Sequence, residues 1–406
     1  MKYALLVGDG MADYPLEELG GRTPLMAANT PNMDWIARNG AVGLVKTIPP
    51  GFSSGTEIAN MSLLGYDPAR YFTGRGPLEA ASMGVSLEAD DVAFRCNLVS
   101  LEVFGSQVIM EDFTAGHISS DEARQIIQDI DRELGTEAIR FYPGLSYRHI
   151  MVWKGAGSNT GLESLSIVPP HDILGKGIFD YLPEVGGEDG IVDLLTRSQV
   201  LLKEHPVNLA RMERGVKPAN SIWVWGQGRR PQIPTLAERF GVKGSVVCAV
   251  DLLKGLGLYA GLEVIDVPGA TGYFDTNYRG KAEYGLRELE EKDLVFIHVE
   301  APDEAGHSGD IPKKIETIET FDKEVVGTIL EGLRDSEEYR VMVLPDHATP
   351  IPLRTHAPDP VPFAIYDSRR RRSWPAGMSF DEESVRQSGV TIEDGYQIMD
   401  AFMRGE

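Results

Sequence analysis

The sequence predicts an α/β fold with a mainly parallel sheet covered by helices on both faces, and a smaller inserted α+β unit. Short apolar segments alternate with amphipathic segments along most of the chain, which is the pattern of parallel strands joined by helices. Residues 112–178 break this rhythm with one helix and several short strands. We therefore expect a core formed by residues 1–111 and 179–406, and an inserted cap formed by residues 112–178.

The first elements follow from apolar runs and from helix start and stop residues. Residues 3–8 form a continuous apolar run, so we expect a buried strand that ends at Asp9. Pro31 and Gly40 are typical start and stop residues for a helix over 31–39. A second strand is expected at 41–48, and a helix begins at Thr56 after a turn-rich loop.

The middle of the chain has a clear helix at residues 119–134, which opens with Ser-Ser-Asp-Glu and carries one apolar face. A loop leading to a short helix is expected at residues 71–82. The expected strands of this region are 92–103, 107–113, 139–144, 148–155 and 163–172.

The C-terminal half returns to alternating strands and helices, which predicts further parallel strands of the same sheet. The expected helices are 192–212, 252–261, 280–291 and 313–333. The expected strands are 221–226, 244–250, 261–267, 293–301 and 339–347.

Composition narrows the possible partners. A net charge of −22 argues against nucleic acid or an anionic membrane surface as the main partner. No apolar run approaches the length of a membrane span. Cys96 and Cys248 form no disulfide framework, so we expect a reducing, cytoplasmic location. The sequence leaves open whether the chain forms a homo-oligomer.

Acidic and histidine side chains gather where predicted strands end. The candidates near the C-terminus are Asp303, His307, Asp346, His347 and His356. Asp9 follows the first strand, and the carboxyl ends of parallel strands meet at one edge of a sheet. Mixed carboxylate and imidazole ligands suit Mn²⁺, Zn²⁺ or Mg²⁺, and two such ions can hold both oxygens of a phosphoryl transfer.

A hydroxyl group near the start of the helix at Thr56 is a candidate nucleophile. A phosphate formed there would lie at a helix N-terminus, which stabilises anions. Thr56 could equally be a simple N-cap, and Ser53 and Ser54 are alternative nucleophiles among which the residues alone do not decide.

Basic side chains provide candidates for binding an anionic substrate. Arg75 lies between two glycines, and Arg95 interrupts a buried-looking strand. His117, Arg148 and His171 lie in the expected cap, where each is also compatible with a structural role. A P-loop motif is absent from the sequence, which argues against an ordinary P-loop kinase.

As a set, these motifs resemble the alkaline phosphatase superfamily, and most closely its archaeal-type, cofactor-independent phosphoglycerate mutases. The resemblance covers nearly the whole chain in the order of that family. Its motifs are LVGDGMAD, NTPNMD, PPGFSSGTEIANMSLLGYDP, YFTGRGPLEAAS, FRCNLV, TAGHIS, EAPDEAGHSGD, PDHATP and THAPDPVPF.

The resemblance implies an alkaline-phosphatase-like three-layer core with an inserted cap, and a two-metal site. One ion would be bound by Asp303, His307 and His356. The second would be bound by Asp9, Asp346, His347 and the nucleophile, a position that falls on Thr56 where these mutases commonly carry serine. Mn²⁺ is the first expectation for both ions, with Mg²⁺, Zn²⁺ or Co²⁺ as alternatives.

The implied activity is interconversion of 2-phosphoglycerate and 3-phosphoglycerate through a phosphoenzyme, without 2,3-bisphosphoglycerate. Arginines such as Arg75 and Arg95 would hold this small phosphorylated substrate. The same blocks also resemble a bacterial branch proposed to act as a homoserine kinase. A phosphatase or phosphodiesterase is a third reading, and a non-enzymatic metal-binding module a fourth.

Overall fold

The computed structural model describes all residues except 106, 157–160, 163–164, 184–188, 371–373, 375–377 and 406. The described chain divides into two compact units. The first unit comprises Met1–Phe72 and Gln232–Glu406, and the second unit comprises Thr73–Pro231. Among the described residues, no helix is long and apolar enough to cross a membrane.

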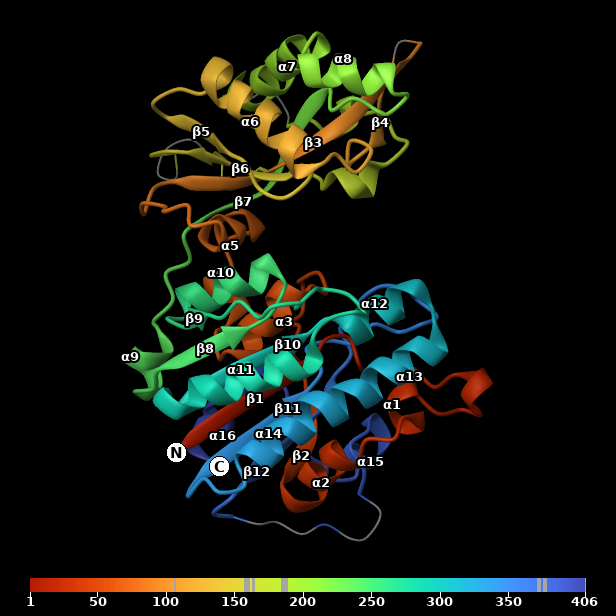
Figure 1. Ribbon diagram of the computed structural model, residues 1–406, viewed down its shortest axis with the longest axis vertical. Coiled ribbons are helices and arrows are strands. Elements are labelled where there is room, and N and C mark those ends of the chain that lie inside the picture. Colours follow the sequence, from red (N-terminus) through yellow and green to blue (C-terminus); the bar gives the residue numbers. More distant parts are fainter. Residues whose placement is uncertain are drawn as a thin grey trace. The chain divides into compact units, whose positions relative to one another are not determined.

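The first unit is built on an eight-stranded sheet, drawn with its helices in Figure 1. In spatial order its strands are β13 (Thr391–Ile392), β2 (Ala41–Val45), β12 (Val361–Asp367), β11 (Tyr339–Leu344), β1 (Lys2–Gly8), β10 (Leu294–Val299), β8 (Gly244–Val247) and β9 (Glu263–Val264). Only β12 runs against its neighbours β11 and β2, and the other pairs are parallel. This confirms the expected α/β class with a mainly parallel sheet.

Helices cover both faces of this sheet because its central strands are apolar on both sides. On one face, Ala4 and Leu6 of β1 belong to a buried core with apolar residues of several helices. These elements are α2 (Pro31–Asn39), α11 (Tyr278–Glu291), α13 (Ile311–Thr320), the π-helical turn η5 (Phe321–Val326), α14 (Gly327–Gly332) and α15 (Glu382–Arg386). On the other face, Tyr3 packs edge-on against Phe402 with ring centroids 5.6 Å apart.

The helices of that second face are α3 (Thr56–Leu63), α10 (Asp251–Tyr259) and α16 (Ile398–Arg404). Shorter elements connect the layers. They are η1 (Glu17–Leu19), α1 (Pro24–Ala27), α4 (Pro68–Tyr71), α9 (Leu236–Phe240), α12 (Ala301–Ser308) and η6 (Gly395–Gln397).

The second unit has its own antiparallel sheet and its own buried core. Its elements are α5 (Arg75–Ser82), β3 (Val92–Phe104), β4 (Gln107–Asp112), α6 (Ser120–Leu134), β5 (Ile139–Tyr142), β6 (Arg148–Trp153), η3 (Pro170–Ile173), η4 (Phe179–Tyr181), α7 (Asp189–Lys203), α8 (Pro206–Glu213) and β7 (Ser221–Arg229). Phe94 and Cys96 face the core shared with α6 and α7, while Ala93 packs with Ala80 of α5 on the opposite face.

The second unit is wider than the expected cap of residues 112–178. The reason is β3, which precedes the expected cap and pairs with β6 inside its boundaries and with β7 beyond them. Thr73 Oγ1 also donates to the carbonyl of Arg229 at 2.5 Å, where the chain enters and leaves the unit. Such pairings between distant segments leave no local signal in the sequence.

Two of the expected elements differ from the structure. The single helix at 192–212 is broken into α7 and α8, because Pro206 cannot continue the first helix and the His205 side chain caps the second. The expected strand at 163–172 is wrong in its described part, which is irregular until η3; residues 163–164 lie outside the described residues. The loop and short helix expected at residues 71–82 are confirmed, and Arg75 is the first residue of the helix, α5.

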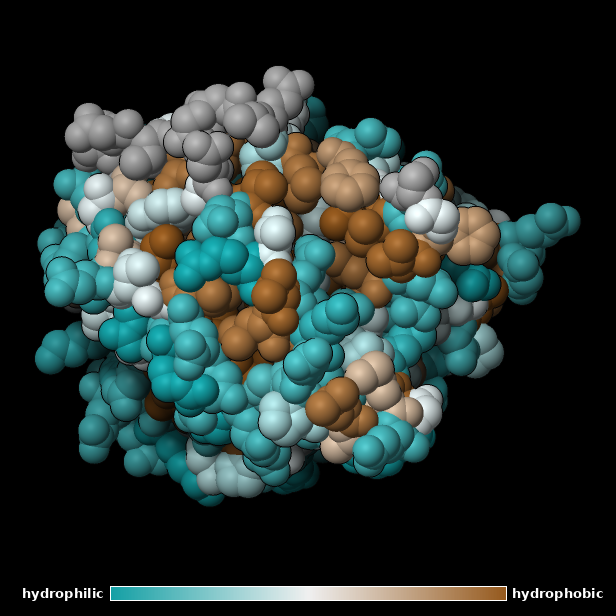
Figure 2. All heavy atoms as spheres, turned by 90° about the horizontal axis from the view of Figure 1, so that it is seen from above, coloured by the Kyte–Doolittle hydropathy of each residue, from teal (hydrophilic) through white to brown (hydrophobic). Residues whose placement is uncertain are grey.

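The face drawn in Figure 2 is mainly polar and carries apolar patches between the polar side chains. The large apolar side chains of the second unit that are exposed include Val103, Phe104, Val200 and Met212. Single exposed apolar residues are common in soluble domains, so we assign no role to them.

Candidate active site

The candidate site lies at one edge of the large sheet, beyond the carboxyl ends of four strands. Asp9 follows β1, Asp346 and His347 follow β11, and Asp303 lies on α12 directly after β10. Strands β2 and β11 are both antiparallel to β12, so they are parallel to each other. The end of β2 therefore lies at the same edge, and the chain continues from there to Thr56. The convergence expected from parallel strand ends is therefore present.

Asp303, His307 and His356 form the first part of the site. The Asp303 carboxylate lies 3.2 Å from His307 Nε2 and 3.4 Å from His356 Nε2, and the two Nε2 atoms are 2.9 Å apart. Nδ1 of His307 lies 3.0 Å from the carbonyl of Arg354, and Nδ1 of His356 lies 2.9 Å from that of Ser54. With Nδ1 beside a carbonyl, each imidazole keeps its Nδ1 proton and turns Nε2 toward Asp303, which is the orientation of a histidine ligand once Nε2 has lost its proton.

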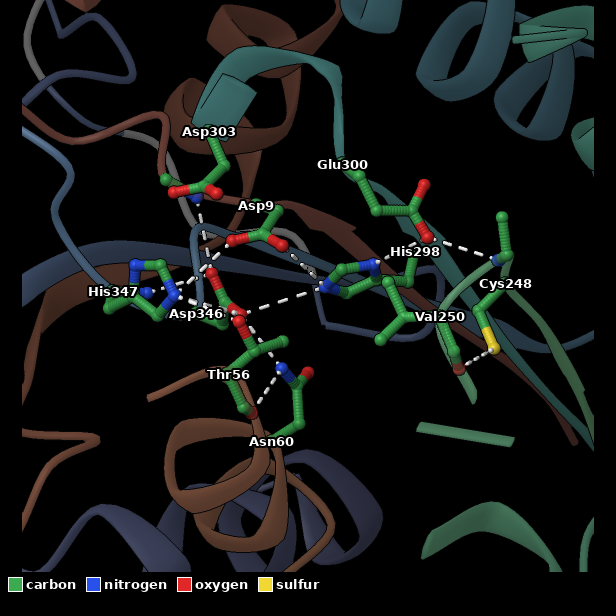
Figure 3. Close-up of polar contacts among 12 residues, drawn as sticks. Asp9, Thr56, Asn60, Cys248, Val250, His298, Glu300, Asp303, Asp346 and His347 are labelled. Carbon is green, nitrogen blue, oxygen red and sulfur yellow. Dashed lines mark hydrogen bonds and ion pairs between the residues drawn. The ribbon is translucent and has the colours of Figure 1, made fainter. Parts of the chain in front are cut away.

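Asp9, Asp346 and His347 form the second part, drawn in Figure 3. His347 Nε2 lies 3.3 Å from Asp9 Oδ1 and 3.3 Å from Thr56 Oγ1. Asp346 is held from several sides, by the backbone N–H groups of Gly10 and His347 and by the side-chain amide of Asn60 at 2.7 Å. Asp9 Oδ1, although buried, accepts no hydrogen bond in the structure.

The electrostatics of the site favour a bound cation. Burial and the neighbouring Asp346 carboxylate raise the pKa of Asp9 well above its usual value. Burial also raises the pKa of Asp303, but hydrogen bonds from His307 and His356 outweigh burial and lower that pKa well below its usual value. Hydrogen bonding to Asp303 raises the pKa of His307 to about 9. Buried acids crowded so closely are stable when positive charge is shared among them.

Among the described residues, two groups of donor atoms lie close enough to hold an ion, with all atoms of a group within 4.8 Å of one another. One group contains Asp303, His347 and His356, and the other contains Asp9, His298 and Asp346. His347 contacts both parts of the site, because its ring centroid is also 4.0 Å from that of His356. An orphaned carboxylate oxygen and inward-facing imidazole nitrogens fit divalent metal ions.

Among the candidate hydroxyls, only Thr56 reaches these groups through its side chain in the contacts described above. Gly55 is the N-cap of α3 and Thr56 is its first residue, so the N-cap interpretation of Thr56 is wrong. Ser53 is exposed, and Ser54 contributes its backbone carbonyl to His356. The Thr56 hydroxyl therefore lies beside both the helix N-terminus and the imidazole of His347.

The residue that the sequence interpretation missed is His298, which was not among the candidate site residues. It is fully buried, and its Nε2 lies 3.4 Å from Asp9 Oδ2 and 3.6 Å from Asp346 Oδ2. A histidine two residues before an acid, His298 and Glu300, at the end of an apolar strand was the available signal. Asn60 was missed as well, although it lies four residues after Thr56 on the same helical face.

Most of the candidate substrate residues form a basic cluster within the second unit. Arg95 is buried against the ring of Trp225, 4.3 Å from its centroid, and pairs with Glu79 at 3.0 Å. Arg75 lies 5.9 Å from the same ring centroid, and the His171 ring packs on Trp225 at 5.4 Å.

Charge repulsion inside this cluster is visible in the pKa of Arg95. Burial lowers that pKa, the Glu79 carboxylate opposes the change, and the positive charges of Arg75 and Arg148 lower it further. Positive side chains crowded around one aromatic ring favour a bound anion. His117 is exposed on the turn after β4, with its backbone in the left-handed region, and we do not count it in the cluster.

The comparisons with known proteins agree with this arrangement. A family model described as 2,3-bisphosphoglycerate-independent phosphoglycerate mutase matches residues 37–208. A relative of that name from Methanosarcina barkeri is 55% identical over 97% of this chain and 96% of its own. The chain belongs to the 2,3-bisphosphoglycerate-independent phosphoglycerate mutases. The family resemblance noted from the motifs is thereby confirmed.

Other members of the mutase family and two solved structures match over nearly the full chain. A probable mutase of this family from Geobacter sulfurreducens is 48% identical over 99% of this chain and 100% of its own. The structure of the PH0037 protein from Pyrococcus horikoshii covers 99% of this chain and 96% of its own at 30% identity, with a TM-score of 0.82. The cofactor-independent phosphoglycerate mutase from Thermoplasma acidophilum covers 100% and 99% at 28% identity, with a TM-score of 0.66.

Proposed function

We propose that this protein interconverts 2-phosphoglycerate and 3-phosphoglycerate through a phosphoenzyme, without 2,3-bisphosphoglycerate. The observation that carries the proposal is the Thr56 hydroxyl, 3.3 Å from His347 Nε2 at the start of α3 and beside a cluster of buried acids and histidines. Relatives that match over the full chain carry the name of this activity.

In the first step, a bond forms between Thr56 Oγ1 and phosphorus while the bond from phosphorus to the glycerate oxygen breaks. The proton of the Thr56 hydroxyl ends on the released glycerate hydroxyl. In the second step, the other hydroxyl of the same glycerate takes the phosphoryl group, and Thr56 regains its proton. The backbone N–H groups at the start of α3 stabilise the phosphoryl group on Thr56 in between.

The buried acids and histidines provide the ligands of two divalent ions in this proposal. Asp303, His307 and His356 would hold one ion, while Asp9, Asp346, His347 and Thr56 would hold the other. Ions at these positions lower the pKa of the attacking hydroxyl and neutralise charge on the phosphoryl group. Mn²⁺ is the ion we expect, with Mg²⁺, Zn²⁺ and Co²⁺ as alternatives that elemental analysis of the purified protein distinguishes.

The basic residues of the second unit are proposed to bind the substrate anion. Arg75 and Arg95 present guanidinium groups beside Trp225, which suits a carboxylate or a phosphate. Arg148, His171 and His117 are the further candidates for this role. Phosphoglycerate carries both a carboxylate and a phosphate, and either group can pair with guanidinium groups.

The test compares two reactions of the same purified, Mn²⁺-loaded protein. One assay supplies 3-phosphoglycerate and couples product formation to enolase, and the other supplies homoserine with ATP. We expect turnover in the enolase-coupled assay and no phosphohomoserine. Phosphohomoserine without mutase turnover would assign the protein to the kinase alternative, and release of inorganic phosphate alone would assign it to a phosphatase.

We propose a cytoplasmic location from the state of the two cysteines. Cys96 and Cys248 are buried and unpaired, which suits a reducing cytoplasm. Whether the chain assembles into a homo-oligomer is measured directly by light scattering coupled to size-exclusion chromatography.

A further inference from the structure

His298 is the one buried histidine of the site that the proposed phosphoryl transfer does not use. It lies on β10, next to β1, with Val7 as its partner in the register. Its side chain is fully buried, and its two ring nitrogens face carboxylates on opposite sides. Figure 3 shows the ring between the Asp9 and Asp346 carboxylates on one side and Glu300 on the other.

The contacts on the site face involve two of the proposed metal ligands. His298 Nε2 lies 3.4 Å from Asp9 Oδ2 and 3.6 Å from Asp346 Oδ2. Asp9 Oδ1, the other oxygen of that carboxylate, accepts no hydrogen bond and points to His347. The imidazole therefore contacts Asp9 Oδ2, which turns away from His347, and leaves Asp9 Oδ1 available to a metal ion.

The contacts on the far side hold the imidazole itself. His298 Nδ1 lies 3.4 Å from Glu300 Oε1, and that oxygen also accepts from the backbone N–H of Ala249 at 3.0 Å. Glu300 Oε2 accepts from the fully buried Lys281 Nζ at 2.8 Å. The same ammonium group donates to the backbone carbonyl of His298 at 2.8 Å. Lys281 thus fixes both Glu300 and the strand that carries His298.

We propose that His298 is a positioning residue, which orients the carboxylates of Asp9 and Asp346 toward a bound metal ion and is itself oriented by Glu300 and Lys281. Neither ring nitrogen of His298 makes a hydrogen bond in the structure, so the imidazole acts on Asp9 Oδ2 through their contact at 3.4 Å. A polar group in contact with the outer oxygen of a ligand carboxylate limits the rotation of that carboxylate. Without this contact, the buried Asp9 side chain loses a defined orientation.

The proposal rests on the two-ion site of the proposed function, but not on the substrate. Its test therefore measures metal binding. Mn²⁺ binding to the metal-free protein is followed by calorimetry for the wild type and for His298→Met, which keeps the approximate length of the side chain and removes both ring nitrogens. We expect at least one of the two ions to bind about 10- to 100-fold more weakly in His298→Met.

A graded variant separates positioning from simple packing. His298→Gln places an amide nitrogen near the position of Nε2 and restores one donor, so we expect it to lose less than about tenfold in Mn²⁺ affinity. Glu300→Gln leaves His298 in place but weakens its support, and we expect an intermediate loss. If His298→Met fails to fold, as judged by thermal unfolding without metal, Glu300→Gln carries the test.

His205→Gln is the matched control. His205 is also a buried histidine paired with a carboxylate, 2.9 Å from Asp129, but it lies in the second unit and caps α8. We expect this variant to bind both ions as the wild type does. A crystal structure of the Mn²⁺-loaded wild type completes the test, since it shows the distance from His298 Nε2 to each ion.

Two results would overturn the proposal. Unchanged affinity for both ions in a folded His298→Met protein would remove any positioning role. An ion within about 2.2 Å of His298 Nε2 would make His298 a direct ligand. Failure of the proposed mutase function is distinguishable from these results. A wild-type protein that binds two ions but does not turn over phosphoglycerate would contradict the mutase function and leave the role of His298 intact.

Discussion

At the scale of single residues, the site depends on how each side chain is held by its neighbours. Asp346 is the clearest case, because one oxygen accepts from two backbone N–H groups and the other from Asn60. Thr349 connects the two parts of the site by donating to Asp303 and lying 3.2 Å from His347 Nδ1. These contacts fix the orientation of the donor atoms before any ion binds.

The first prediction concerns Thr56. We expect Thr56→Ala to lose at least about a thousand-fold in kcat and to form no phosphoenzyme, because the attacking oxygen is removed. Its Mn²⁺ affinity should remain near that of the wild type for the ion held by Asp303, His307 and His356. Mass spectrometry of the protein after incubation with 3-phosphoglycerate measures the phosphoenzyme.

Thr56→Ser is the matched control for this prediction. It keeps the hydroxyl and removes only the methyl group that restricts the rotamers of threonine. We expect it to retain both turnover and phosphoenzyme. A Thr56→Ala protein that still turns over would point to Ser53 or Ser54.

The second prediction concerns Glu382 on α15, which is not among the proposed metal ligands. Burial raises its pKa to about 7, although hydrogen bonds from Thr23 and Asp13 oppose the change. Between pH 4.5 and 7 the unfolded chain loses this proton while the folded protein keeps it, so folding stability falls as the pH rises. Glu382→Gln has no proton to lose and avoids this decline.

We therefore expect Glu382→Gln to match the wild type near pH 4 and to exceed it by roughly 1–2 kcal/mol at pH 8, a value reduced for partial solvent exposure. Urea unfolding at both pH values measures this difference. Glu383→Gln, at the exposed next position on α15, should show no such pH dependence. A constant difference between Glu382→Gln and wild type across this range would contradict the prediction.

At the scale of elements, the sheet edge gathers the site because strand direction brings distant segments together. The ends of β1, β10 and β11 carry Asp9, Asp303 and Asp346 to the same edge. The antiparallel strand β12 begins at this edge of the sheet, where the parallel strands end. His356 lies in the segment that leads into the first residue of β12, so it joins ligands that follow the other strands.

The third prediction concerns the attachment of the last helix to the sheet. Arg340 on β11 is buried, donates to Asp367 on β12 at 2.7 Å, and donates to the carbonyls of Phe402 and Met403 at the end of α16. We expect Arg340→Met to lower the free energy of unfolding by about 3 kcal/mol, because a buried carboxylate and helix-end carbonyls lose their donor.

Arg404→Met is the control from the same helix. Its side chain makes an exposed pair with Asp400 at 3.1 Å, four residues earlier, so we expect a loss of about 0.5 kcal/mol or less. Urea unfolding compares the two variants. Equal losses would show that the buried contacts of Arg340 do not hold α16 on the sheet.

At the scale of the whole molecule, the chain forms two units, each with its own sheet and core. The second unit is one continuous segment, and β3 and β7 pair near its two ends. A continuous segment with its own core is expected to fold alone. The proposed metal ligands all belong to the first unit.

The fourth prediction follows from this division. The segment of residues 73–231, expressed alone, should unfold cooperatively, and Mn²⁺ should not change its melting temperature. In the full chain, Mn²⁺ at 100 times its Kd should stabilise the first unit by about 2.7 kcal/mol, and EDTA should reverse the effect. Calorimetry of both proteins checks this, and a metal-dependent melting temperature for the isolated segment would contradict it.

Local sequence patterns predicted some parts of this fold and missed others. The helices at 31–39 and 119–134 were predicted nearly to the residue, because each carries an apolar face and clear start and stop residues. Strand β12 and the true extent of the second unit were missed. Their existence depends on pairing with β2 and β11, and on the pairing of β3 with β7, which no local pattern records.

The sequence by itself determined the fold class, the family and the types of donor groups at the strand ends, because apolar periodicity and short motifs are local properties. Only the tertiary structure decided which donors face one another, that Thr56 rather than Ser53 lies beside His347, and that His298 contacts Asp9 and Asp346. The physical reason is that strand order, direction and register are set by packing between distant segments. A histidine inside an apolar strand has the same local sequence whether it faces a hydrophobic core or a pair of carboxylates.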